Sequence, residues 1–158
     1  MPIYIKYGDI KGDVTSESHK EWIEVNSFQW GVGRGISSPT GRGADRESSA
    51  PSISEIVVTK AQDTATTKLL NEALQGEGVK VQIDFVKTDG KKLETYMTYK
   101  LEDVMVSGYS ISSGGDRPSE SLSLNFTKIE FKAFDMDKAN KGAASASVGY
   151  DIAAAKVI

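Results

Sequence analysis

The chain has 158 residues, a formal net charge of −3, one histidine and no cysteine. This length suits one domain that buries roughly 70% of the surface of its unfolded chain. The near-neutral charge argues against a nucleic-acid partner, because the chain has no excess of cations to displace counterions from phosphates. The lack of cysteine excludes disulfides, thiolate metal sites and cysteine nucleophiles.

The first residues, MPIYIKYGDIKGD, lack the basic stretch and following apolar stretch of a Sec-type signal. No run in the sequence approaches ~18 consecutive apolar residues. We therefore expect a protein made in the cytoplasm that does not insert into a membrane. If it is exported, we expect a route that reads no N-terminal signal.

Alternating apolar residues predict a first strand from Ile3 to Tyr7 and a second within EWIEVNSFQW at 21–30. In the second strand Ile23 and Val25 share one face, whereas Phe28 and Trp30 have the other parity. The switch predicts a bulge or a strand covered on both faces. An apolar second face would be exposed in a monomer, which is typical of an interface.

The region 31–52 is rich in Gly, Ser, Pro and Arg without periodicity, and it predicts a long extended loop. The loop begins with GVGRG, which resembles a phosphate-binding turn. Its glycine spacing does not fit G-x-G-x-x-G, no helix pattern follows, and no Gly-Lys-Ser/Thr occurs. We interpret GVGRG as a turn that leaves the strand.

A third strand, 52–60, precedes the one convincing helix, 63–75, which Asp63 or Thr64 can cap and after which Gly76 occupies the C′ position. Strands are then predicted at 79–85 and 93–101, joined by an Asp89-Gly90 type I′ turn, and at 104–111. After a loop at 112–118, a long strand from Leu122 switches parity before Ile129, which predicts a second bulge.

The segment 135–158 is rich in Ala and Ser and predicts a tail with one ordered piece at 148–152. We therefore predict a single domain, 1–158, with a mainly β fold. It would be a closed β-barrel or two tightly packed antiparallel sheets, with one flanking helix and the long extended loop.

The sequence predicts no catalytic, cofactor-binding or metal-binding residue, and we expect no enzyme activity. His19 lies in a polar stretch that predicts a surface loop, and no G-x-S-x-G elbow supports a Ser-His-Asp triad. One histidine, no cysteine and no D-x-D-x-D-G run leave no metal motif. The acidic pairs Glu102–Asp103 and Asp116–Glu120 are interpreted as solvated charges.

Several motifs in order resemble the Hcp family, the haemolysin-coregulated tube proteins of bacterial type VI secretion. They are Gly8-Asp9-Ile10-Lys11-Gly12, His19, Trp22-Ile23-Glu24-Val25, Phe28-Gln29-Trp30-Gly31, Thr59-Lys60-Ala61-Gln62-Asp63 with Leu69-Leu70, Gly114-Gly115-Asp116-Arg117-Pro118-Ser119-Glu120, Leu122-Ser123-Leu124-Asn125-Phe126 and Gly149-Tyr150-Asp151. The resemblance runs over essentially the whole chain.

This resemblance implies a closed β-barrel with a side helix, six copies in a ring, and rings stacked into a tube that a contractile sheath drives outward. The implied partners are further copies of the chain, sheath and spike or tip proteins, and effectors carried in the lumen or on the tip. The implied destination is outside the cell or inside a target cell. A contractile-phage-like tail tube protein is the nearest alternative, and an independent secreted enzyme is a third.

Two sets of residues carry our expectations about contacts. Gln29 is expected to face the lumen and contact effectors, because Phe28 and Trp30 pack on the opposite side of the strand. The loop 31–50 is expected to reach a neighbouring protomer or the next ring. The residues expected at ring or stacking interfaces are Gly41, Arg42, Gly43, Ala44, Asp45, Asp116 and Arg117.

Overall fold

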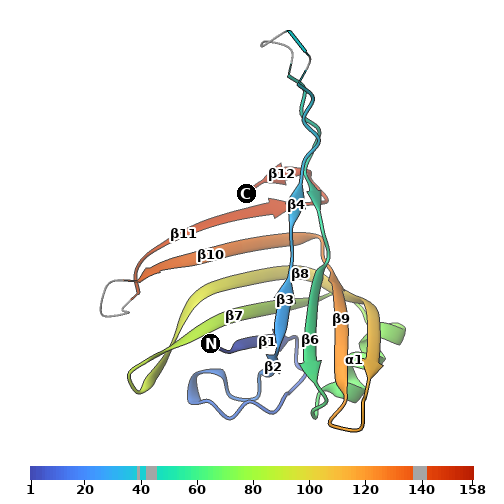
Figure 1. Ribbon diagram of the computed structural model, residues 1–158, viewed down its shortest axis with the longest axis vertical. Coiled ribbons are helices and arrows are strands. Elements are labelled where there is room, and N and C mark those ends of the chain that lie inside the picture. The colour runs from blue at the N-terminus through green and yellow to red at the C-terminus, as the bar shows by residue number, and fades with distance from the viewer. Residues whose placement is uncertain (39, 42–45, 137–141) are drawn as a thin grey trace.

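The computed structural model describes residues 1–38, 40–41, 46–136 and 142–158. These residues form one α-helix, one short 3-10 helix and twelve strands (Figure 1). The helices are α1 (Thr66–Gln75) and η1 (Glu17–His19). The strands are β1 (Ile3–Tyr7), β2 (Ile23–Val25), β3 (Ser27–Gln29), β4 (Val32–Gly33), β5 (Ser52–Ile53), β6 (Ile56–Ala61), β7 (Val79–Asp89), β8 (Lys92–Ser112), β9 (Ser119–Asn125), β10 (Lys128–Met136), β11 (Gly142–Asp151) and β12 (Lys156–Val157).

Two antiparallel sheets enclose the core. The large sheet has the order β12-β11-β10-β8-β7-β1-β2, and the small sheet has the order β3-β6-β9-β8. The long strand β8 belongs to both sheets, and it bends at Asp103, which has a left-handed φ of 55°. The prediction of a mainly β fold with two packed sheets is confirmed. A closed barrel is not confirmed, because no ladder among the described residues joins the end strands β2 and β3.

The two parity switches mark places where the chain passes from one sheet to the other. Val25 ends β2 in the large sheet, and Ser27 begins β3 in the small sheet. The reverse passage occurs between Asn125, at the end of β9, and Lys128, at the start of β10. Because the sheets face each other, apolar residues of opposite parity point into one core. The prediction of a bulge at each of these two places is therefore wrong.

Phe28 and Trp30 belong to this core and do not form a separate exposed face. The Phe28 ring lies edge-on to Phe85, with centroids 5.1 Å apart, and 4.9 Å from the ring of Tyr99. Trp30 packs on Tyr99, with centroids 5.6 Å apart. The second apolar face of this strand thus packs partly on the core, and its role at an interface stays a prediction.

The helix α1 covers one end of the core through Leu69, which is fully buried. It begins at Thr66, three residues after the predicted start. Asp63 still satisfies the helix N-terminus, because its Oδ1 accepts the backbone N–H of Ala65 at 2.9 Å. At the other end the N–H of Gly76 donates to the carbonyl of Glu72 at 2.9 Å.

Three other segments differ from the sequence predictions. The loop 31–52 is a paired arm rather than an irregular loop, since β4 pairs with β5 and Ile36 bridges Ser48. The segment 135–158 contains the strands β11 and β12, so it is not mainly a tail. The β7–β8 turn is centred on Gly90 and Lys91, because Asp89 pairs with Lys92.

Candidate functional site

The exposed face of the small sheet carries mostly short, uncharged side chains, and its one charged neighbour among the described contacts is Glu55, whose Oε2 accepts a hydrogen bond from the Ser107 hydroxyl beside Ser123. One row of paired residues crosses four strands as Ser27, Thr59, Ser121 and Ser110. The next row crosses them as Gln29, Val57, Ser123 and Gly108. None of the outward-facing residues paired in these described ladders is Asp, Glu, Lys or Arg. We call this surface the hydroxyl face.

The outer face of the large sheet has the opposite character. Lys6, Lys80, Lys100, Lys128, Glu102 and Glu130 line a depression of about 490 Å³ across β1, β7, β8 and β10. Lys128 Nζ lies 4.0 Å from Glu102 Oε2 on this face. The molecule therefore has one sheet surface with few charges and one that is densely charged.

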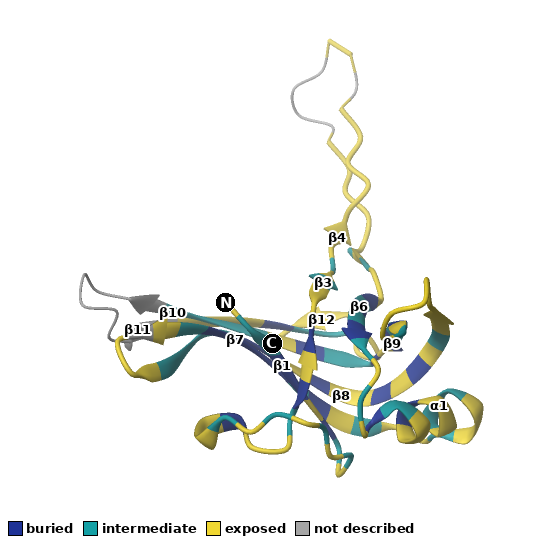
Figure 2. Ribbon diagram, turned by 60° about the horizontal axis from the view of Figure 1, so that its bottom comes forward, coloured by how far each residue is buried: buried dark blue, intermediate teal, exposed yellow. Residues whose placement is uncertain are grey.

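The arm from β4 to β5 projects from the end of the small sheet (Figure 1). Its strands are held by the pair Gly33–Ser52 and by the Ser37 N–H, which donates to the Glu47 carbonyl at 2.8 Å. Figure 2 shows the described part of the arm as exposed along almost its whole length. An exposed, ordered arm of this kind has few contacts within its own chain.

An apolar groove of about 280 Å³ lies at the base of the arm, where β4, β5, β11 and β12 meet. Its lining includes Trp30, Val32, Ile53, Phe131, Val148 and Val157. Val148 and Val157 remain 54% and 70% exposed. The indole nitrogen of Trp30 is buried without a hydrogen-bond partner. A single chain thus leaves both apolar surface and a polar donor unsatisfied at this place.

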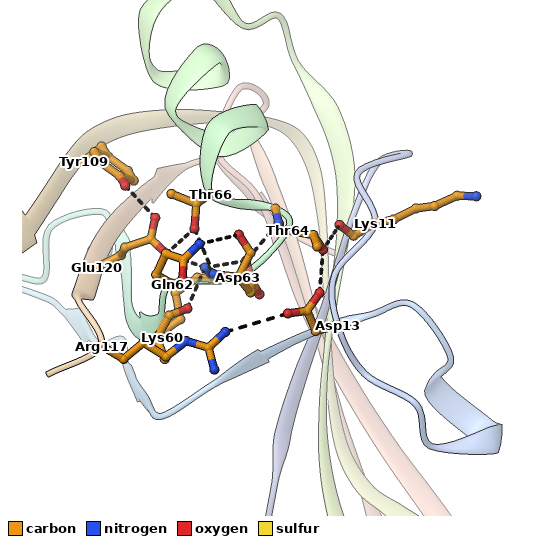
Figure 3. Close-up of polar contacts among 12 residues, drawn as sticks. Lys11, Asp13, Lys60, Gln62, Asp63, Thr64, Thr66, Tyr109, Arg117 and Glu120 are labelled. Carbon is orange, nitrogen blue, oxygen red and sulfur yellow. Dashed lines mark hydrogen bonds and ion pairs between the residues drawn. The ribbon is translucent and has the colours of Figure 1, made fainter.

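A buried ion pair joins β6 to β9 on the core face of the small sheet (Figure 3). Lys60 Nζ lies 2.5 Å from Glu120 Oε2 and 2.9 Å from Asp63 Oδ1. Glu120 also accepts hydrogen bonds from the hydroxyls of Tyr109 and Thr66. The sequence interpretation of Glu120 as a solvated charge is wrong, because this side chain is buried.

These contacts set the titration of the buried network. Burial by itself raises the pKa of Glu120, but the hydrogen bonds from Lys60, Tyr109 and Thr66, together with the Lys60 charge, outweigh it and hold the pKa below its ordinary value. Burial and the hydrogen bond to Glu120 raise the pKa of Tyr109 to about 12. The network is therefore satisfied with Glu120 ionised and Tyr109 neutral.

His19 is buried, so the prediction that it lies in a surface loop is wrong. Its Nε2 lies 2.8 Å from Asp84 Oδ2, and its Nδ1 lies 2.8 Å from the Ser18 hydroxyl. The ring also packs edge-on to Trp22, with centroids 4.6 Å apart. Asp84 is the outward-facing residue of β7 that ties the loop 11–22 to the large sheet.

Gly12 shows why the G-D-I-K-G stretch needs its second glycine. A Cβ at this position would lie 2.4 Å from the Trp22 carbonyl oxygen. The Gly12 N–H donates to the Glu21 carbonyl at 2.8 Å. The close approach of two backbone segments, required by the His19 loop, excludes any side chain here.

The predicted contact residues do not form one cluster. Gln29 is exposed on β3, on the side opposite Phe28, as the sequence predicted. Asp116 and Arg117 are exposed in the loop between β8 and β9. Arg117 Nη2 lies 3.9 Å from Asp13 Oδ2 of its own chain (Figure 3). Gly41 is near the arm tip, and the residues outside the described part of the chain are Arg42, Gly43, Ala44 and Asp45.

Two types of site are not found in the described residues. No group of three or more His, Asp or Glu side chains is placed to hold a metal ion. None of the described helices combines the length and the apolar character needed to cross a membrane.

A family model and a known protein that resemble this chain both point to the same family. Residues 4–132 match the model of the family described as "Type VI secretion system effector, Hcp". The protein hcp1 of Pseudomonas aeruginosa is 28% identical over 133 residues, which cover 82% of this chain and 81% of that protein.

Solved structures agree in fold. A structure of a type six secretion system protein has a TM-score of 0.91 at 28% identity and covers 99% of both chains. A type VI secretion system effector from Yersinia pestis has a TM-score of 0.75 at 24% identity, covering 94% of this chain and 98% of its own. Because the family model spans most of the sequence, the chain belongs to the Hcp family of type VI secretion system proteins.

Proposed function

We propose that this chain is the building block of the inner tube of a type VI secretion system. Six copies form a ring, the rings stack, and the lumen carries effectors while a sheath drives the tube outward. The protein is made in the cytoplasm and exported with the tube, whose ends contact the spike or tip proteins. Family membership supports the secretion role.

The main observation that supports a ring is that both edge strands of the small sheet lack a partner on one side in the part of the chain that the structure describes. Among the described residues β3 pairs only with β6, and β8 beyond Met105 pairs only with β9. Unpaired strand edges are templates for pairing with another chain. The two edges differ, so a contact between β8 of one copy and β3 of the next is head-to-tail and generates a ring when the rotation closes.

We propose that the hydroxyl face lines the lumen of this ring. A lumen that must release its cargo benefits from short, neutral side chains, because strong ion pairs would hold one cargo and exclude others. Gln29 lies on the edge strand β3 of that face, beside Val57. The charged outer face of the large sheet is then left for the sheath.

The arm supports contacts beyond one protomer. It is ordered by its own pairing yet exposed, so a neighbouring protomer or the next ring is the natural partner for residues 31–50. Deleting residues 40–46 should weaken ring formation or stacking in electron micrographs. Unchanged rings and stacks would remove the arm from the interface. Asp116 and Arg117 are proposed as minor contacts, since exposed ion pairs contribute about 0–1 kcal/mol.

Negative-stain electron microscopy of the purified protein tests the proposal. We expect six-fold rings, and we expect Ile111→Lys to reduce them, because Ile111 is 51% exposed on the free β8 edge. Thr88→Lys is the matched control, since it adds the same charge at an exposed strand position outside the small sheet. Monodisperse single chains in the unmodified protein would contradict the proposal.

A further inference from the structure

Two exposed apolar features lie on different parts of the described surface. One is the groove at the base of the arm, around Trp30 and Val148. The other is the solvent side of α1, where Leu70 and Leu74 are 40% and 77% exposed. These leucines are four residues apart, so they share one helix face and form a ridge. Neither feature has a partner within the described chain.

The two features match in chemistry. No residue that lines the groove carries a charge. The last turn of α1 has no basic residue, and Leu74 is followed by Gln75 and Gly76. Burying a leucine in such a groove is favourable without desolvating any charge.

The two features also lie beside the two free edges of the small sheet. Trp30 follows Gln29, the last residue of β3, so the groove adjoins the β3 edge. The helix α1 packs against β8, which provides the other edge (Figure 2). A contact that joins the β8 edge of one copy to the β3 edge of the next therefore places α1 of the first and the groove of the second beside the same seam.

We infer that Leu70 and Leu74 of one protomer dock into the Trp30–Val148 groove of the next protomer in the ring. This inference rests on the proposed ring. It names the side chains that join neighbouring protomers at a place away from the hydroxyl face. The occupant is a second copy of this chain, because the ridge and the groove are present once in every copy and a head-to-tail contact uses both. The orphaned Trp30 indole is consistent with a surface that is completed only on assembly.

Cross-linking tests the inference directly, because the chain has no cysteine to interfere. In the double variant Leu74→Cys with Val148→Cys, a short bismaleimide should link neighbours into a ladder that ends at the hexamer on a denaturing gel. Lys68→Cys with Val148→Cys is the matched control, since Lys68 is exposed on another face of α1. Val148→Cys alone should give no ladder.

A second measurement is Leu74→Ser, which should raise the dissociation constant of the ring contact roughly ten- to one-hundred-fold. Asn71→Ser on the same helix, which removes no apolar surface, should change it little. A ladder confined to the Leu74 pair supports the inference. Six-fold rings without that ladder would overturn the inference and leave the proposed tube function intact. Single chains without rings would overturn both.

Discussion

Lys60 and Glu120 face each other across the β6–β9 ladder, with Nζ 2.5 Å from Oε2 and neither side chain exposed to solvent. Asp63, Thr66 and Tyr109 complete the hydrogen bonds of the pair. The pair thus ties the small sheet to the start of α1. The pair lies on the core face of the small sheet, the same face as Val58 and Leu122, and so it does not reach the hydroxyl face.

Lys60→Met should lower the free energy of unfolding by about 3–5 kcal/mol, because it leaves the Glu120 carboxylate buried without its cation. Urea unfolding measures the change. Lys11→Met is the control, since Lys11 forms an exposed pair with Glu21 and should cost no more than about 1 kcal/mol. Equal losses of unfolding free energy in the two variants would show that the buried pair contributes no more to stability than the exposed pair.

Acid should destabilise the protein through Glu120. The pKa of this carboxyl is lower in the folded chain than its ordinary value of 4.5, so its contribution is full above that value and is lost as the pH falls through the lower folded value. The free energy of unfolding should therefore fall as the pH is lowered from about 4.5. Glu120→Gln should show a shallower fall, and an identical pH dependence would assign the effect to other carboxyls.

His19→Ala should cost about 1.5–3 kcal/mol, because it removes a hydrogen bond to the buried carboxylate of Asp84. Amide hydrogen exchange should accelerate in residues 14–22, which the His19 ring holds against the large sheet. Lys20→Ala, at the exposed neighbouring position, should change the free energy of unfolding by no more than about 0.5 kcal/mol. It should leave the exchange rates of residues 14–22 unchanged. Unchanged exchange in His19→Ala would show that the loop is held by its backbone bonds alone.

Gln29→Arg should reduce co-purification of effectors while rings persist, because it introduces a long cation on a face of mostly short, uncharged side chains. Ser147→Arg is the control, as it adds the same charge at an exposed position of the large sheet. Equal retention in the two variants would mean that cargo does not contact the hydroxyl face.

Local periodicity in the sequence predicted the strand content, the helix and the side of β3 on which Gln29 lies. Parity switches at Asn26 and before Ile129 were also visible, but their cause was not, because a bulge and a passage between two sheets leave the same pattern. Only the pairing of β3 with β6 and of β10 with β8 separates these causes.

The buried polar groups could not be predicted from local sequence. Lys60 and Glu120 alternate with neutral residues on their strands and resemble solvated charges, and they are opposite each other only through the β6–β9 register. His19 lies among polar residues, and its partner Asp84 is 65 positions away. The arm escaped prediction because its described pairs, Val32–Ile53, Gly33–Ser52 and Ile36–Ser48, are few and give no continuous apolar alternation.

Native mass spectrometry of the purified protein tests the central claim most directly. The account predicts a dominant species of six times the 17.1 kDa chain, which Ile111→Lys shifts toward single chains and Thr88→Lys does not. A dominant single chain at micromolar concentration, or an assembly whose copy number is not a multiple of six, would contradict the ring.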